Sequence, residues 1–433
     1  MKLSHYLKIF ESRDNPDECI VFSTKRASIV QLARETLTEI ASGDLCREDA
    51  DLLARLEIIV PDVEAEKKAM LAFGRTWGRS SPVLNIVAIL NLDCNFACPY
   101  CYENGVKGNF YMSAQTADAL IAFARQRFDA DKKMLLVDFH GGEPLLSLDL
   151  IQHISGALKP FVESRNGTYA FTLVTNGSLL NRKTVEALKT LGLESVKITL
   201  DGPAELHNSS RPFKSGAGTF DVIVNHIKEI CDLVKVNIGG NFEQGNYRRF
   251  PELLDVLIDE GLTPDRVGRI KFDPVTASID RSEALAAYKG GCSCLNEPWL
   301  VEAEAFLREA IFARGYRTVK PQPAFCMVES ENSFTVNWDG GIYKCPAFAG
   351  RQGFQAGDLK SGVWNASDPY HVGLWGKNQA CMDCAYLPMC FGGCRFLKFV
   401  RDGRIDEVDC KKPYLDAALE GLILQEVRYR DGR

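Results

Sequence analysis

Apolar stretches of strand length alternate with amphipathic helical stretches through the middle of the chain, from about residue 82 to residue 275. The strand-like runs are VLNIVAILNL, MLLVDFHG, YAFTLVTNG, SVKITLDG, VKVNIGGNF and VGRIKFDPV. The stretches between them, such as SAQTADALIAFARQRF and RKTVEALKTLG, have apolar residues at helical spacing. Six strand–helix alternations predict right-handed parallel units, hence an α/β fold. Six units are too few to close an eight-fold barrel, so we expect an open, partial (β/α)6 barrel over residues 82–275.

The first 78 residues have a different pattern, which predicts a small winged-helix-like domain. KLSHYLKIF and ECIVFST are typical of short strands, and LEIIVPDV of a wing strand. SIVQLARETLTEIASG, REDADLLARL and VEAEKKAMLAF are typical of three helices, the first ending at Gly43. GRTWGRSS, rich in Gly and Ser, is the expected linker to the barrel.

After the barrel the chain changes character twice. Residues 276–320 are typical of a helical connector and contain Cys292 and Cys294. Residues 321–433 are rich in cysteine and glycine and poor in helix, until a closing helix, PYLDAALEGLILQEVRYR. We therefore expect a cysteine-rich C-terminal domain over residues 321–433.

Composition and charge limit the classes of partner and the cellular compartment that we expect for this chain. The net charge of −6 and pI of about 5.7 argue against a dedicated nucleic-acid binder. No run of about 18 apolar residues occurs, and the start lacks an apolar signal-peptide core, so we expect a cytoplasmic protein with no membrane partner. In a reducing compartment, regularly spaced cysteines more often bind metal than form disulfides. Of the 15 cysteines, the isolated Cys19, Cys46 and Cys231 fit the role of small buried apolar residues.

Three cysteines directly follow the first barrel strand, in the spacing Cys94-x3-Cys98-x2-Cys101. Ligands of open parallel sheets lie at the carboxyl ends of the strands, so this position suits chemistry. Three thiolates can bind three irons of a [4Fe–4S] cluster and leave the fourth iron without a protein ligand. A zinc site needs four ligands, and neither His140 nor another nearby His or Cys has suitable spacing.

The cysteine spacing and four further strand-end motifs resemble the radical S-adenosylmethionine (radical SAM) superfamily. His140-Gly-Gly-Glu-Pro resembles the family's GGEP motif, Thr175-Asn-Gly its TNG motif, and Thr199-Leu-Asp-Gly-Pro its SLDGP motif, with Thr in place of the common Ser. Arg211 stands where the family has an arginine that clamps a carboxylate. The positions that this resemblance assigns to S-adenosylmethionine are Tyr100, Gly141, Gly142, Glu143, Thr175, Asn176, Thr199 and Arg211.

The resemblance also implies roles for some of these positions. Tyr100 is similar to the aromatic residue that lies against adenine, and Glu143 to the acceptor of hydrogen bonds from the cosubstrate's ammonium. The two glycines of the motif allow close approach of the backbone. Taken singly, each motif is also explained by ordinary turns at strand ends.

The remaining regularly spaced cysteines resemble the seven-cysteine SPASM extension of radical SAM enzymes that modify peptides and proteins. That resemblance implies two auxiliary [4Fe–4S] clusters, in addition to the radical SAM cluster, with interleaved ligands. A pair of zinc knuckles explains the CxxC segment but not all seven cysteines. The implied ligands are Cys381, Cys384, Cys390 and Cys410 for an outer cluster, and Cys326, Cys345 and Cys394 for an inner cluster.

Seven thiolates are one fewer than two complete sites require. Some family members have an eighth cysteine just before the first, but here residues 320–325 are KPQPAF. Either Cys292 or Cys294 completes the inner cluster, or an iron stays open and is able to bind a thiolate of the substrate. Sulfatase-maturing relatives carry a basic aspartate directly after the second cysteine of the extension, where this chain has Pro346. The nearby Asp339 and Asp358 stand in turn-like contexts.

Together these resemblances imply a maturase of a ribosomally synthesised precursor peptide, similar to sactipeptide, ranthipeptide and geopeptide maturases. The implied product is a crosslink, and a thioether from a peptide cysteine is the first expectation. The alternatives are another modification of the peptide, namely a carbon–carbon crosslink or epimerisation, and the maturation of a folded protein such as a sulfatase. A non-enzymatic iron–sulfur electron carrier is the alternative from another class. The N-terminal domain resembles leader-peptide recognition domains, which add the leader as an extra strand at a sheet edge. The expected electron donor is a protein such as flavodoxin or ferredoxin.

Overall fold

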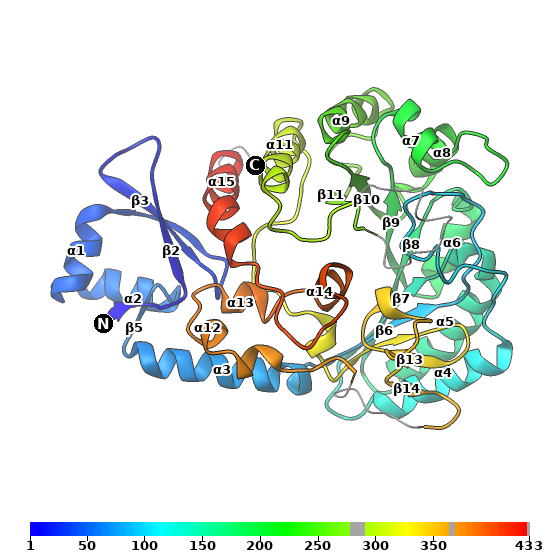
Figure 1. Ribbon diagram of the computed structural model, residues 1–433, viewed down its shortest axis with the longest axis horizontal. Helices are drawn as coiled ribbons and strands as arrows, with labels where there is room; N and C mark the ends of the chain where they lie inside the picture. Colours follow the sequence, from blue (N-terminus) through cyan, green and yellow to red (C-terminus); the bar gives the residue numbers. More distant parts are fainter. Residues whose placement is uncertain (278–290, 363–368, 431–433) are drawn as a thin grey trace.

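The computed structural model describes residues 1–277, 291–362 and 369–430 (Figure 1). Parts of the predicted connector and of the predicted cysteine-rich domain, residues 278–290, 363–368 and 431–433, lie outside the described residues. Among the described helices, none is long and apolar enough to cross a membrane.

Six parallel strands form the centre of the molecule, and each lies beside the strand that precedes it in the chain. This confirms the six predicted strands and gives a large, mostly parallel sheet that is consistent with the predicted partial barrel. The strands are β6 (Val83–Ile89), β7 (Met134–His140), β8 (Thr168–Thr175), β9 (Leu193–Thr199), β10 (Lys235–Phe242) and β11 (Arg269–Pro274).

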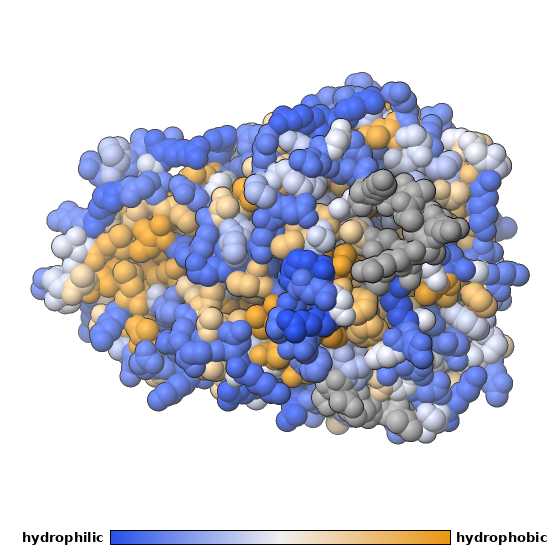
Figure 2. Space-filling model, viewed as in Figure 1, coloured by the Kyte–Doolittle hydropathy of each residue, from blue (hydrophilic) through white to orange (hydrophobic). Residues whose placement is uncertain are grey.

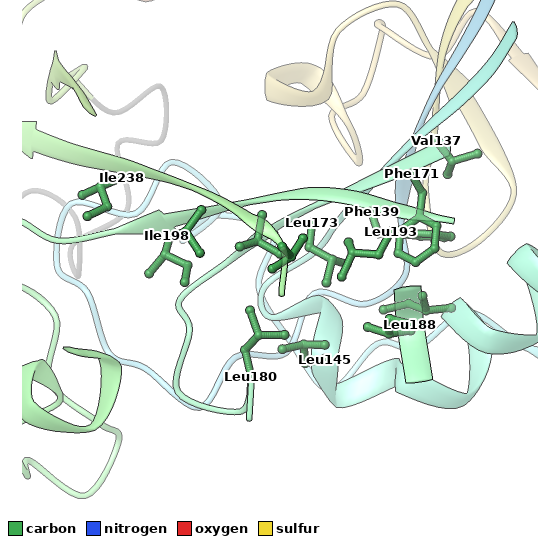
Figure 3. Packing of buried hydrophobic residues seen from close by; sticks show 14 of the residues in the cluster. Val137, Phe139, Leu145, Phe171, Leu173, Leu180, Leu188, Leu193, Ile198 and Ile238 are labelled. Atoms are coloured by element: carbon green, nitrogen blue, oxygen red, sulfur yellow. The ribbon is translucent and has the colours of Figure 1, made fainter. Parts of the chain in front are cut away.

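The connecting helices lie where the apolar periodicity predicts them, except for the short α7, which was not predicted. Along β7 burial alternates strictly, with Leu135, Val137 and Phe139 buried under the helices and the residues between them on the opposite face. Figure 3 shows Val137 and Phe139 packed with side chains of β8 and of the helical layer. The helices are α4 (Ala114–Arg127), α5 (Leu148–Glu163), α6 (Arg182–Thr190), α7 (Ala204–Ser210), α8 (Phe220–Ile230) and α9 (Phe250–Asp259).

The cysteine-rich segment extends the barrel sheet instead of forming a separate layer. β12 (Ser333–Val336) pairs in parallel with β6, and β13 (Gly341–Tyr343) and β14 (Gly357–Asp358) follow antiparallel, so the sheet has nine strands. All four residues of β12 are buried, which explains why this short apolar run adds to the first barrel strand.

Helices account for most of the remaining C-terminal part. The predicted closing helix is confirmed as α15, and its apolar side packs on the N-terminal sheet, where Leu419 and Ile423 meet Ile20 and Phe22 (Figure 1). The helices are α11 (Pro298–Ala313), α12 (Gln379–Met382), α13 (Leu387–Cys390), α14 (Arg395–Asp402) and α15 (Lys412–Arg430).

The N-terminal unit has its strands and helices in the predicted order along the chain, with one correction, and its winged-helix-like character stays a prediction. The prediction of a single helix over residues 28–43 is wrong in its first part, because residues 29–33 form a strand that pairs with β3. The helix begins only at Arg34 and ends at Gly43 as predicted, with Gly43 in the left-handed conformation. The strands are β1 (Lys2–Leu3), β2 (Leu7–Glu11), β3 (Glu18–Ser23), β4 (Ile29–Ala33) and β5 (Ile59–Val60), and the helices are α1 (Arg34–Ser42), α2 (Arg47–Arg55) and α3 (Val63–Ser80).

The predicted linker GRTWGRSS is wrong, since these residues continue helix α3 almost to their end. The two glycines of this segment are points of close contact with neighbouring parts of the chain, and they do not break the helix. A Cβ at Gly78 would lie 2.3 Å from the carbonyl oxygen of Glu329, and one at Gly74 would lie 2.6 Å from the ring of Phe391. The glycines therefore let α3 lie directly on the cysteine-rich segment. This close packing explains why glycines, which disfavour a helix in isolation, occur inside α3.

The prediction for the isolated cysteines holds for two of the three. Cys19 is buried and Cys231 half-buried, as expected of small apolar residues. The prediction is wrong for Cys46, which is exposed and whose Sγ accepts a hydrogen bond from the backbone N–H of Asp49 at 3.4 Å, at the start of α2.

Candidate active site

A cavity of about 390 Å³ opens at the carboxyl ends of the parallel strands. The three cysteines after β6 line it, together with seven of the eight residues that the sequence assigns to S-adenosylmethionine. The predicted location at the strand ends is therefore where the structure brings these residues together. The predicted residues in the wall are Cys94, Cys98, Cys101, Tyr100, Gly141, Gly142, Thr175, Asn176, Thr199 and Arg211.

The loop after β6 turns its thiols into the cavity. Cys94 and Cys98 are buried and Cys101 is half-buried. Burial raises the pKa of Cys94 to about 11 and also raises the pKa of Cys98, against the opposing effect of nearby Arg211. Thiolates at these positions need positive charge close by. Bound iron would supply it, and Lys107, which is hydrogen-bonded to Cys101, adds to it.

The two glycines after β7 are required by contact with this cysteine loop. A Cβ at Gly142 would lie 2.1 Å from the carbonyl oxygen of Asp93, and one at Gly141 would lie 2.8 Å from that of Asn91. The backbone N–H groups of Gly142 and Glu143 donate to those same two carbonyls, at 3.1 and 2.8 Å. The motif therefore fixes the position of the segment that leads into Cys94.

Glu143 lies behind the cavity wall and not in it. Its carboxylate is fully buried and accepts hydrogen bonds from the Thr175 hydroxyl at 2.7 Å and from the backbone N–H groups of Asn176 and Leu145 at 2.8 and 3.0 Å. Burial nevertheless raises its pKa above the ordinary glutamate value. In this arrangement Glu143 joins the end of β7 to the end of β8, and its contact with the cosubstrate stays a prediction.

Tyr100, Asp201 and Arg211 form one buried network on the opposite wall. The Tyr100 hydroxyl donates to Asp201 and accepts from the Arg211 guanidinium at 2.7 Å, and the Arg211–Asp201 ion pair measures 3.9 Å. The backbone N–H of Asn241 donates to Asp201 at 2.7 Å. Within the described residues, the buried Nε of Arg211 has no hydrogen-bond partner. A carboxylate in the cavity would supply that partner, so this wall fits an amino-acid cosubstrate such as S-adenosylmethionine.

Several residues of the site were missed by the sequence reasoning, and four of them illustrate why. Asp201 lies inside the TLDGP motif but was not given a role, although it organises Tyr100 and Arg211. Lys107, His140 and Asn241 line the cavity as well. Asn241 and His140 had a usable signal, since both stand at the end of a parallel strand; Lys107 stands in a loop and had none.

The three inner cysteines lie together beside the radical site. The thiol pKa of Cys345 is raised first by burial and then by the neighbouring Cys326 and Cys394. Tyr102 lies between this group and the cavity. Its pKa is raised first by burial and by Glu103, and then by the charges of Cys101 and Cys345. The inner set is thus adjacent to the loop of the first three cysteines.

The four outer cysteines surround a separate cavity of about 200 Å³. Burial, followed by the charges of the other three thiols, raises the pKa of Cys381 to about 11. Among the described residues, no group of three or more Cys, His, Asp or Glu side chains is spaced to hold a metal ion. The cysteines in its wall are Cys381, Cys384, Cys390 and Cys410.

Cys292 and Cys294 are not among the cysteines whose charges raise the pKa of Cys345. Cys292 is buried in the core of the barrel, and burial and the neighbouring Glu297 raise its pKa to about 11. Cys294 accepts a hydrogen bond from the backbone N–H of Asn296, and the Asn296 side chain donates to the carbonyl oxygen of Cys410 at 2.9 Å. Cys294 therefore lies in the surroundings of the outer set, and a ligand role for either residue stays a prediction.

The two aspartates near the inner cysteines have the turn roles expected of them. The Asp339 carboxylate accepts from the backbone N–H of Gly341 at 2.9 Å, and the Asp358 carboxylate from that of Lys360 at 2.8 Å. Pro346 begins a short helical turn directly after Cys345 and has no side-chain group that accepts a proton.

Comparisons with known proteins agree with the site. The family model of the Radical SAM superfamily matches residues 89–266. An uncharacterized protein of Methanocaldococcus jannaschii is 28% identical over 262 residues, which are 59% of this chain and 82% of that protein. A probable GTP 3′,8-cyclase of Saccharolobus solfataricus is 28% identical over 197 residues, which are 45% of this chain but only 58% of the cyclase.

Two solved structures have a similar fold at low sequence identity. Native anSMEcpe with bound AdoMet and Kp18Cys peptide has a TM-score of 0.63 at 17% identity and covers 81% of this chain and 99% of its own. Streptococcus suis SuiB bound to precursor peptide SuiA has a TM-score of 0.53 at 16% identity and covers 94% of this chain and 98% of its own. A radical SAM fold implies one [4Fe–4S] cluster and S-adenosylmethionine, and the cavity fits both. Residues 89–266 therefore form a Radical SAM superfamily domain, and the chain is a radical SAM enzyme.

Proposed function

We propose that this chain is a maturase of a ribosomally synthesised precursor peptide, and that it installs a thioether crosslink from a peptide cysteine. The observation that carries the proposal is that the chain gathers two further sets of cysteines, an inner three whose charges affect one another and an outer four that line their own cavity. An enzyme that only cleaves S-adenosylmethionine needs none of these seven thiols. The similar folds of anSMEcpe and SuiB, both crystallised with peptides, support a peptide substrate.

The residues of the main cavity have separate tasks in this proposal. Cys94, Cys98 and Cys101 hold the radical SAM cluster, and Arg211 holds the cosubstrate's carboxylate through its unpartnered Nε. When bound, the cluster and S-adenosylmethionine supply a 5′-deoxyadenosyl radical, which removes a hydrogen atom from an unreactive carbon of the peptide. Asp201 holds Arg211 and Tyr100 in place for this.

The C-terminal cysteines hold two auxiliary [4Fe–4S] clusters in this proposal. Cys381, Cys384, Cys390 and Cys410 are the ligands of the outer one, and burial of their thiols favours a bound cation over free thiolates. Cys326, Cys345 and Cys394 are ligands of the inner one, beside Tyr102 and the radical site. Its fourth position is taken by Cys292 or Cys294, or stays open for a peptide thiolate.

The N-terminal unit is proposed to bind the leader of the precursor. The strand order β2-β3-β4 leaves β2 and β4 at the edges of the small sheet, where an extended peptide can pair. The unit carries the exposed apolar side chains Ile9, Leu52 and Phe73, and Figure 2 shows apolar residues gathered at its end of the molecule. Its first helix offers little for DNA, because α1 has one Arg and two Glu.

The preference for a crosslink over oxidation of a folded protein rests on Pro346. Without an acid after Cys345, oxidation of a serine or cysteine on a folded protein lacks the base that such relatives use. All 15 cysteines are free in the structure, and clusters need reduced thiols, which is consistent with a reducing cytoplasm and a flavodoxin- or ferredoxin-type electron donor.

The test is co-expression with a short, cysteine-containing open reading frame that lies beside the gene, followed by mass spectrometry of the peptide. The proposal expects a loss of two hydrogens per crosslink and a loss of free thiol at the same site. A peptide variant with each cysteine changed to serine is the control and should stay unmodified. An unchanged mass with altered stereochemistry would point to epimerisation, and a modified Cys-to-Ser peptide would point to a carbon–carbon crosslink; either overturns the thioether.

Enzyme variants separate the clusters. Cys384→Ala should lower the iron content and abolish the crosslink, while the enzyme still cleaves S-adenosylmethionine, because the outer set is remote from the main cavity. Cys292→Ser and Cys294→Ser distinguish the two inner alternatives. Loss of inner-cluster iron in either variant identifies a protein ligand, and full iron in both leaves the position for the peptide thiolate.

A further inference from the structure

The sheet face opposite the helices is polar, unlike the packed interior of a closed barrel. Burial alternates along the strands, so that Asp138 and His140 of β7 share this face with Thr172 of β8 and Lys197 of β9. At the carboxyl end the face becomes the wall of the main cavity, which His140 and Lys197 line. A substrate group next to the cosubstrate therefore meets titratable side chains of the sheet itself.

His140 is held in an environment that keeps its ring neutral. Burial lowers the pKa of His140, the nearby Asp138 opposes this, and Lys197 adds to it. Asp138 is itself held by a hydrogen bond from the Thr172 hydroxyl. In the described part of the chain, neither nitrogen of the His140 ring forms a side-chain hydrogen bond, so a ring nitrogen is available to the cavity.

The other buried histidine near the site shows the contrast. The Nδ1 of His207 accepts from the backbone N–H of Asp201 at 3.1 Å, and its Nε2 lies 3.0 Å from the Thr219 hydroxyl. Because the Thr219 hydroxyl donates to the carbonyl oxygen of Arg211, the Nε2 of His207 is the donor of that pair. His207 thus has both nitrogens occupied and a structural role, whereas His140 does not.

Most of the remaining titratable groups of the cavity are poor proton acceptors. Tyr100 and Arg211 are bound to each other and to Asp201, and both keep their protons at neutral pH. Lys107 is a cation beside the cysteine loop, and its pKa is raised. The further titratable residues in the wall are the cluster cysteines, Tyr102, Glu103 and Lys197. Burial raises the pKa of Glu103 to about 7, so Glu103 is also able to accept a proton. It belongs to the cysteine loop and accepts from the Tyr102 hydroxyl at 3.3 Å, whereas His140 is the acceptor on the sheet side.

We propose that His140 accepts the proton that the peptide loses when the crosslink forms, and that Asp138 is the positioning residue for its ring. The inference rests on the proposed function, since epimerisation needs no such acceptor. It answers the question that Pro346 raises, namely where the proton goes in an enzyme that has no acid after Cys345.

The atoms and electrons of the step balance as follows. A peptide carbon loses one hydrogen atom, which becomes part of 5′-deoxyadenosine. The peptide thiol then loses its S–H bond as the C–S bond forms. The proton goes to a ring nitrogen of His140, and the one remaining electron goes to an oxidised iron–sulfur cluster. The net oxidant is S-adenosylmethionine, and the proton passes from His140 to solvent before the next turnover.

The experiment compares His140→Gln with the matched control His153→Gln in the reconstituted holoenzyme and the precursor peptide. His153 is an exposed histidine of α5, paired with Asp118 on the surface. Crosslink and 5′-deoxyadenosine are measured together. We expect His140→Gln to form 5′-deoxyadenosine but to lose crosslink per 5′-deoxyadenosine by about 100-fold, the usual size of a lost general base. An equal ratio in both variants overturns the inference.

The pH dependence gives a second readout that a merely structural role would not move. Because the pKa of His140 lies below the ordinary value of 6.5, the wild-type ratio should stay constant from pH 8 to about pH 6.5 and fall only below that. Asp138→Asn removes the carboxylate that favours the charged ring, so it should move this fall to lower pH. A wild-type ratio that does not fall in acid, or an Asp138→Asn profile identical to wild type, overturns the inference.

A third measurement does not depend on turnover or on the folding of a variant. Hydrogen–deuterium exchange at the C2 position, followed by mass spectrometry, gives the pKa of each of the six histidines in the anaerobic holoenzyme. We expect His140 below 6.5; a value above 7 overturns the inference. If wild-type enzyme makes no crosslink on any peptide, the proposed function has failed; if it makes one and His140→Gln makes it equally well, only this inference has failed.

Discussion

The inner cysteines are held together by a buried ion pair, and breaking it should cost a large part of the stability of the protein. Glu329 stands three residues after Cys326, and Arg395 directly follows Cys394. Their side chains, 4% and 2% exposed, meet at 2.7 Å. The second oxygen of Glu329 accepts from the backbone N–H of Gly373 at 2.8 Å.

The consequence of Glu329→Ala follows from the contacts that Arg395 keeps in that variant. The Arg395 guanidinium keeps only long contacts to backbone carbonyls, at 3.3–3.4 Å, and stays a buried charge without a counter-ion. Removal of one partner of a buried pair typically costs 3–5 kcal/mol, so we expect a loss of about 3–5 kcal/mol. Whole domains are stable by about 5–15 kcal/mol, so the change should be evident as both a lower denaturation midpoint and a lower iron content.

The assay is anaerobic urea denaturation of the holoprotein, with iron counted on the same samples. The matched control is Glu331→Ala, two residues away, which breaks the exposed pair with Arg79 and should cost at most about 1 kcal/mol. The double variant Glu329→Leu/Arg395→Met removes both charges and should recover most of the loss. If Glu329→Ala costs no more than Glu331→Ala, or if the double variant is as unstable as the single one, the pair does not hold the inner site.

Three further outcomes follow from the same contacts. Gly142→Ala should force the Asp93 backbone away from its 2.1 Å approach and abolish 5′-deoxyadenosine formation with a loss of about 1–3 kcal/mol in urea denaturation; normal activity would contradict the role of this contact. Gly78→Ala should lower stability by a similar amount because of the Glu329 carbonyl at 2.3 Å, whereas Gly156→Ala, in open space on α5, should raise it by about 0.5–1 kcal/mol; equal effects would refute the packing argument. His207, with a pKa lowered by burial to about 3, stays neutral while the unfolded chain takes up a proton near 6.5, so stability falls as pH falls. Between pH 6.5 and 5.5 the wild type should lose about 1 kcal/mol more than His207→Gln, and parallel pH curves would contradict the assignment.

The strand–helix alternation was enough to predict the central sheet because burial on one face and helical cover on the other impose a repeating pattern. The same reasoning failed where tertiary contact overrides local preference. Residues 29–33 look helical in a window that includes α1, but pairing with β3 makes them a strand. Gly74 and Gly78 look like a linker, and only the partner surface explains why they are helical.

The candidate site was predictable to the extent that it lies on strand ends. The family resemblance named ten of the residues that line the main cavity. It also implied an inner and an outer group of cysteines, and the outer four line one cavity in the structure, while their roles as cluster ligands stay a prediction. It did not place Glu143 behind the wall, because orientation depends on which backbone groups the carboxylate meets. Nor did it reveal the network around Asp201, which joins residues about a hundred positions apart in the chain.

The most direct test of the central claim is one mass measurement on the precursor peptide, made together with the count of 5′-deoxyadenosine. Reconstituted enzyme, S-adenosylmethionine, dithionite and a cysteine-containing precursor should give 5′-deoxyadenosine and a peptide that has lost two hydrogens per crosslink. Cys98→Ala, which removes one of the three thiols in the main cavity, should give neither product. Abundant 5′-deoxyadenosine with a peptide of unchanged mass and unchanged free thiols would contradict the proposed crosslinking function.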